Sequence, residues 1–77
     1  MVEFETIKAE IKSFGTRNFI EVSRKKAKSE KGENEFLSIS RGFIAQDGSR
    51  RYTKSIALPL DAEMVKFIAE TLESCLQ

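Results

Sequence analysis

The sequence predicts an α+β fold in which a four-stranded antiparallel sheet is followed by one C-terminal helix. Before residue 59, four stretches show the period-two alternation that is typical of half-buried strands. Asp47-Gly48 lies between two β-rich runs and indicates a hairpin turn, because glycine reaches positive φ without a side-chain clash. After Pro59, apolar residues recur at helical spacing instead.

The first strand includes residues 7–12, where apolar and charged residues alternate. Val2 and Phe4 alternate in the opposite phase, so we expect a bulge near Glu5 and Thr6 if the strand begins that early. A short turn at Gly15-Thr16 follows this strand.

The second strand is predicted over residues 18–25, with Ile20 and Val22 on its buried face. Residues 26–34 are polar, contain glycine and lack apolar periodicity, so we expect an exposed loop there. This loop overlaps the densest basic run, residues 24–31. The run is either a solvated tip that keeps the protein soluble or a flexible arm that contacts phosphates.

The third and fourth strands form the predicted hairpin of residues 36–58. Leu37 and Ile39 continue the buried face. Gly42 suggests a bulge that would re-aim Phe43 and Ile44, because glycine inside a strand often marks an irregularity. The fourth strand is apolar near its end and basic near the turn, so this hairpin presents a basic, aromatic and hydroxyl-rich surface.

Pro59 ends the sheet because it lacks a backbone donor, and Asp61 is expected to cap a helix that runs to about Leu76. The apolar stripe of this helix is broader than one small sheet can cover. We interpret the surplus as a two-fold homodimer interface; the alternative is a helix that sinks deeper into its own sheet. The residues assigned to the dimer interface are Met64, Phe67, Thr71 and Cys75.

A chain of 77 residues is expected to form one domain, residues 1–77, which buries only about 60% of its unfolded surface. One cysteine and no histidine leave no intramolecular disulfide and no metal site, so self-association is the remaining way to stabilise the domain. We expect no membrane span, secretion signal, cofactor or small-molecule substrate, and a cytoplasmic location. We also expect no enzymatic activity, because nucleophilic catalysis has no candidate when Cys75 lies on an apolar helix face.

The net charge of +1 is unevenly divided along the chain. Residues 11–60 contain eleven Lys or Arg against five Asp or Glu, while both ends are net negative. Cations beside aromatic rings favour single-stranded nucleic acid, because cations contact the backbone and rings stack on unpaired bases. Packing in the protein is the alternative role for each ring, including Phe19 and Phe36. The candidate nucleic-acid-binding residues are Lys12, Arg17, Arg24, Lys25, Lys26, Lys28, Arg41, Phe43, Arg50, Arg51, Tyr52 and Lys54.

The stretch FLSISRGFIAQDGSRRYTKSIALPLDAEMVKFIAETL resembles the third strand, acidic-glycine turn, basic fourth strand and C-terminal helix of the transcriptional coactivator positive cofactor four. FIEVSRKK resembles its second strand, and the strand order is similar to that of its single-stranded DNA-binding superfamily, which includes the Whirly proteins and PUR repeats. The resemblance covers roughly residues 7–76. It implies a dimer whose helices pack together and whose paired sheets present grooves to unpaired DNA.

The resemblance also implies that Phe43 stands where the coactivator has a stacking tryptophan. Lys25 or Lys26 stands near its second stacking phenylalanine, and a lysine there would exchange stacking for phosphate contact. We therefore predict a homodimeric single-stranded DNA-binding or RNA-binding protein of the transcriptional-coactivator-like type. A protein-interaction or assembly module without a nucleic-acid ligand is the alternative.

Overall fold

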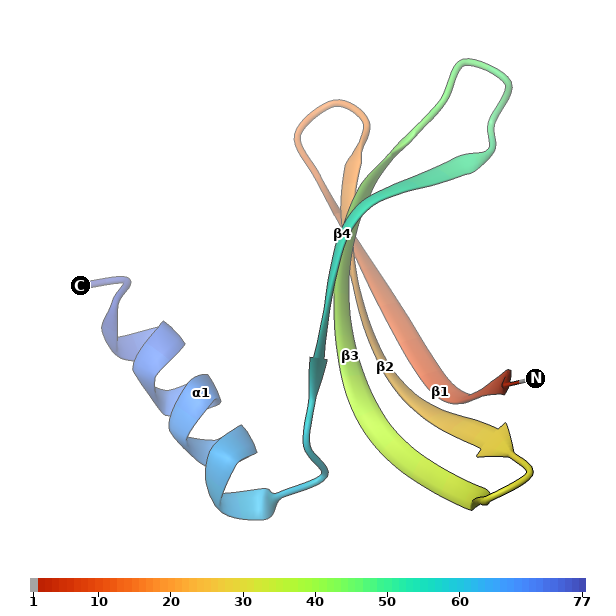
Figure 1. The fold of residues 1–77 in the computed structure, drawn as a ribbon. Helices are drawn as coiled ribbons and strands as arrows, with labels where there is room; N and C mark the ends of the chain where they lie inside the picture. The colour runs from red at the N-terminus through yellow and green to blue at the C-terminus, as the bar shows by residue number, and fades with distance from the viewer. Residues whose placement is uncertain (1) are drawn as a thin grey trace.

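The computed structural model describes residues 2–77 and confirms the predicted α+β fold. Four antiparallel strands lie side by side in the order β1-β2-β3-β4, and one helix follows them (Figure 1). The elements are β1 (Glu3–Phe14), β2 (Asn18–Ser29), β3 (Gly32–Ile44), β4 (Arg50–Leu58) and α1 (Ala62–Ser74). Within residues 2–77, no helix is long and apolar enough to cross a membrane.

The strand register sorts the side chains of the sheet onto two faces, since directly paired residues point to the same side. One face of the sheet is turned toward α1, and we call it the helix face. Its centre consists of Val22, Leu37, Ile39, Ile56 and Leu58. The serine face carries the alternate residues, and its centre consists of Ser23, Ser38, Ser40 and Ser55. The strands bend away from α1, so the serine face is the inner side of the curl (Figure 1).

Burial in the sheet differs from the prediction, which placed Val22 and Ile39 on the buried face. Val22 is 53% exposed, whereas Ser38 and Ser40 are buried. Phe19, 1% exposed, is the one buried hydrophobic residue of the described chain. The curl of the sheet encloses the small serines, while α1 leaves the helix face largely uncovered. The apolar alternation therefore marks a surface that α1 covers only in part.

The prediction of a loop over residues 26–34 is wrong. β2 and β3 extend through this stretch and leave only a turn at Glu30 and Lys31 between them. Gly32 has a φ of 130°, and the Ser29 hydroxyl accepts a hydrogen bond from the Lys31 amide at 3.3 Å. The extended strands lack apolar periodicity because Lys and Glu side chains face each other across them. The basic run is thus part of the sheet.

The sheet has two register shifts close to the predicted bulges. The first lies between residues 6 and 8 of β1. The second lies between Arg41 and Gly42, where Thr53 of β4 has no partner on β3. Because the extra residue belongs to β4, the pairing of β3 with β2 is uninterrupted and Phe43 keeps the phase of its strand. The prediction that Gly42 would re-aim Phe43 is therefore wrong.

Close packing explains the glycine at position 42. A Cβ atom on Gly42 would lie 2.2 Å from the carbonyl oxygen of Arg51 and 2.8 Å from Cζ of Phe19. The Phe19 ring occupies this space and meets Tyr52 edge to face, with the ring centroids 5.3 Å apart. Gly42 therefore allows two aromatic rings to pack on the serine face.

α1 begins as predicted, with Asp61 as its N-cap. The Asp61 carboxylate accepts a hydrogen bond from the Glu63 amide at 3.0 Å. The helix ends at Ser74, shortly before the predicted end near Leu76. It faces the sheet across an apolar hollow of about 190 Å³, whose helix side is formed by Val65, Ile68, Ala69 and Leu72.

The chain is flatter and more exposed than a compact protein of its size. Its radius of gyration is 14.6 Å, against about 11.5 Å expected for this length. It exposes 6431 Å², whereas a compact monomer of 8.7 kDa exposes about 4,700 Å². No residue of α1 is buried. The excess, about 1,700 Å², is surface that a packed protein of this mass would cover.

Candidate nucleic-acid interface

One end of the sheet carries the β1–β2 turn, residues 15–17, and the β3–β4 turn, residues 45–49; we call it the turn end. Six of the predicted basic residues lie at or next to it: Lys12, Arg17, Arg41, Arg50, Arg51 and Lys54. None of these six forms an ion pair with a residue in the described part of the chain. The turn end is therefore a concentration of unpaired positive charge.

Two rows of side chains run across the four strands on the helix face of the turn end. The outer row is Phe14, Asn18, Phe43 and Arg51. The inner row is Lys12, Ile20, Arg41 and Lys54. Because both rows belong to one face, the register brings cations and rings from β1, β3 and β4 onto a single surface.

Phe14 and Phe43 are the two accessible rings of this surface. They lie on either side of Asn18 in the outer row, about 10 Å apart across two strand spacings. Each ring residue is 41% exposed. The guanidinium carbon of Arg41 lies 5.6 Å from the centroid of the Phe14 ring, which is cation–π geometry. Base stacking and phosphate contact are thus both available within the two rows.

Phe14 was not among the residues predicted from the sequence. Its alternation with Lys12 places both on one face. However, only the register through β2 brings Phe14 into the row of Phe43. The alternation was a signal for the face of Phe14, but not for its neighbours.

The β3–β4 turn is held by Asp47, which confirms the predicted turn at Asp47-Gly48. One carboxylate oxygen accepts hydrogen bonds from the Ser49 hydroxyl at 2.6 Å and the Ser49 amide at 2.9 Å. These hydrogen bonds lower the pKa of Asp47. The Gly48 amide, at a φ of 88°, donates to the Ala45 carbonyl at 2.9 Å. This turn positions Arg50 at the start of β4.

Tyr52 lies on the serine face and does not share a surface with Phe43, contrary to the prediction. The unpaired Thr53 shifts the phase of β4, so Tyr52 and Lys54 point to opposite faces. The Tyr52 hydroxyl donates to a carboxylate oxygen of the buried Glu21 at 3.1 Å. Burial, and then this hydrogen bond, raise the pKa of Tyr52. The hydroxyl of Tyr52 thus provides a hydrogen-bond donor to the buried carboxylate.

The other predicted rings also lie on the serine face. Phe19 is buried, which excludes base stacking on it. Phe36 packs edge to face against Phe4, with centroids 6.2 Å apart. Lys25 lies beside these two rings and lines a hollow of about 360 Å³ with them. Lys25 is therefore on the opposite face of the sheet from the two rows of the turn end.

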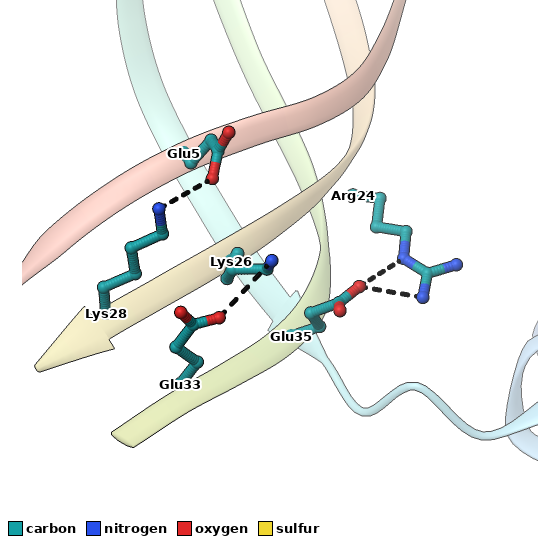
Figure 2. A network of polar contacts seen from close by, with 6 residues as sticks. All are labelled: Glu5, Arg24, Lys26, Lys28, Glu33 and Glu35. Atoms are coloured by element: carbon teal, nitrogen blue, oxygen red, sulfur yellow. Dashed lines mark hydrogen bonds and ion pairs between the residues drawn. The ribbon is translucent and has the colours of Figure 1, made fainter. Parts of the chain in front are cut away.

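The remaining basic candidates, Arg24, Lys26 and Lys28, lie on the helix face near the β2–β3 turn and are paired with carboxylates (Figure 2). The pairs are Arg24 with Glu35 at 2.8 Å, Lys26 with Glu33 at 3.4 Å and Lys28 with Glu5 at 3.3 Å. Apart from Lys25, the structure thus divides the predicted basic residues into an unpaired group at the turn end and a paired group at the opposite end.

The residues predicted for a dimer interface lie on α1 or at its end and are exposed: Met64, Phe67, Thr71 and Cys75. Phe67, for example, is 63% exposed. Within residues 2–77, no group of three or more His, Cys, Asp or Glu residues is arranged to hold a metal ion.

A scan against protein-family models, a search of curated proteins and a search of solved structures each found no match. The geometry of the chain is therefore the basis on which a function is assigned.

Proposed function

We propose that this chain is a non-enzymatic, single-stranded DNA-binding or RNA-binding protein that acts as a homodimer. The observation that supports the proposal best is the turn end, where four of the six unpaired cations, Lys12, Arg41, Arg51 and Lys54, share one face with two exposed rings. Each phosphate that a cation neutralises releases counterions, which favours binding at low salt. Each base that stacks on an aromatic ring contributes about 1–3 kcal/mol.

A single strand fits this surface better than a duplex does. Bases in a duplex are already stacked on each other, so Phe14 and Phe43 would find no free partner. Major-groove readout usually requires a basic helix. Residues 62–74 form the helix, and they contain Lys66 as their one cation against three glutamates.

A second copy of the chain is the proposed cover for α1 and for the apolar centre of the helix face. The excess surface of about 1,700 Å² per chain is larger than the roughly 800 Å² that each partner buries in a standard interface. Exposed apolar side chains are found on both α1 and the sheet, including Phe67, Leu72 and Ile56. A two-fold dimer would bury the same surface on both chains.

Titration of fluorescently labelled oligo-dT, the corresponding RNA and a matched duplex at low salt tests the binding proposal. We expect one of the single strands to bind more tightly than the duplex. Absence of binding to both single strands would refute the proposed function.

Sedimentation at micromolar concentration tests the dimer separately, and we expect twice the chain mass. A protein-interaction module is the second candidate, because the apolar hollow between α1 and the sheet would also fit a segment of another polypeptide. A chain that remains monomeric would refute the homodimer and favour this second candidate for the helix face.

A further inference from the structure

Three ion pairs link β1, β2 and β3 at the end of the sheet opposite the turn end; we call this region the hairpin end. Figure 2 shows that Arg24, Lys26 and Lys28 all extend from β2. The carboxylates come from the strands on either side, Glu5 from β1, and Glu33 and Glu35 from β3. The cations therefore form a central strip that lies between two acidic strips.

The register explains why each cation has a carboxylate within reach. Lys26 is paired with Glu5 on one side and Glu35 on the other. Lys28 is likewise paired with Glu3 and Glu33. The ion pairs run diagonally across these rows, so Lys26 and Lys28 are each close to more than one carboxylate, whereas Arg24 is paired with Glu35. Hydrogen bonding to Glu5, followed by its charge, raises the pKa of Lys28.

The charge arrangement differs sharply between the two ends of the same face. A phosphate that approaches the hairpin end must displace a carboxylate from each cation and is repelled by the carboxylates that remain. A phosphate that approaches Arg41 or Lys54 at the turn end displaces no carboxylate of residues 2–77. Along one strand, Arg24 is four residues from the inner row of the turn end, or about 13 Å.

We propose that Glu5, Glu33 and Glu35 are specificity-determining residues that confine the single strand to the turn end, a role that rests on the proposed function. These carboxylates occupy the three cations that the hairpin end presents on the helix face, so that a strand bound to this face neutralises its phosphates at the turn end alone. Arg24, Lys26 and Lys28 are consequently structural elements of the hairpin and contribute nothing to binding in the native chain.

The test uses the full chain with Glu5→Gln, Glu33→Gln and Glu35→Gln combined. Labelled oligo-dT is titrated over a series of salt concentrations, and the slope of log affinity against log salt is measured. Three released cations should make the slope steeper by about 2, since each phosphate contact to a single strand contributes roughly 0.7. Exposed ion pairs contribute about 0–1 kcal/mol each, so the variant should remain folded, as circular dichroism would verify. Glu35→Gln alone, with an expected change of about 0.7, is the fallback variant.

Two controls separate this local effect from the change in net charge. Glu63→Gln, Glu70→Gln and Glu73→Gln remove the same charge from α1 and should leave the slope unchanged. Lys26→Ala with Lys28→Ala should also leave the slope unchanged in the native chain. In the triple glutamine variant, however, the same two alanines should remove most of the added slope.

Each result decides between the alternatives. An unchanged slope in the triple glutamine variant would overturn the inference, as would a clear loss of slope when Lys26 and Lys28 are replaced in the native chain. If the native chain binds no single strand but the variant does so through Lys26 and Lys28, the carboxylates block the hairpin end and the proposed function is wrong. If neither chain binds, both proposals fail.

Discussion

Phe43→Ala should weaken single-strand binding and leave the fold intact. The ring lies in the outer row of the turn end and is 41% exposed. Loss of one base stack costs about 1–3 kcal/mol, which corresponds to a roughly 5-fold to 150-fold weaker affinity. Phe→Ala in a packed core costs about 3–5 kcal/mol of stability, and we expect a smaller loss for this half-exposed ring. Fluorescence anisotropy with labelled oligo-dT measures the affinity, and urea unfolding measures the stability.

Phe43→Leu is the matched control, because leucine keeps an apolar side chain but offers no flat ring. Phe43→Leu should weaken single-strand binding almost as much as Phe43→Ala does, but it should lower the stability by less. Both variants should keep the salt slope of the native chain, since neither removes a charge, whereas Arg41→Gln should reduce that slope by about 0.7. Unchanged affinity of Phe43→Ala would refute the role of the ring, and loss of the fold would make Phe43 a core residue.

Two further predictions concern the serine face. Tyr52 is the one tyrosine in a chain without tryptophan, so an absorbance titration reports on it alone; its pKa should lie above the ordinary value of about 10, and Glu21→Gln should lower it. The protonated Tyr52 hydroxyl has a higher pKa in the folded chain than in the unfolded chain. Its contribution to stability is therefore present below about pH 10 and is lost as the pH rises through the folded-state pKa. A titration midpoint at or below 10 would contradict the burial of the hydroxyl. Gly42→Ala should lower the free energy of unfolding, measured in urea, by at least about 1–3 kcal/mol, because the added Cβ atom would overlap the Arg51 carbonyl. A variant with native stability would show that packing of the Phe19 ring does not require a glycine at position 42.

Features that depend on a few adjacent residues were predictable from the sequence. Asp47-Gly48 specifies its turn through the Asp47 carboxylate and the positive φ of the glycine. Pro59 and Asp61 likewise define the start of α1, because one lacks a donor and the other caps the first turn.

Features that depend on partners distant in the sequence were not predictable. Residues 26–34 lack apolar periodicity, yet they form strands because Lys26 meets Glu33 across the β2–β3 hairpin. Tyr52 appeared to share the face of Lys54, and a single unpaired residue, Thr53, reverses that relation. Hydrophobic alternation reports neither ion pairs across strands nor the position of a bulge.

The candidate site was therefore predictable as a set of residue types, but not as an arrangement. The basic residues were identified, whereas their division into an unpaired turn end and a paired hairpin end requires the register. The same limit applies to the buried face. The alternation of Val22 with its neighbours indicates an apolar surface correctly, but it cannot show that this surface remains open in a single chain.

The salt dependence of oligo-dT binding to the native chain tests the central claim most directly. Six unpaired cations at the turn end and about 0.7 per phosphate contact predict a slope of roughly −4 per chain, or about a 300-fold loss of affinity between 50 and 200 mM salt. A slope near zero would contradict the claim that unpaired cations at the turn end bind the nucleic-acid backbone.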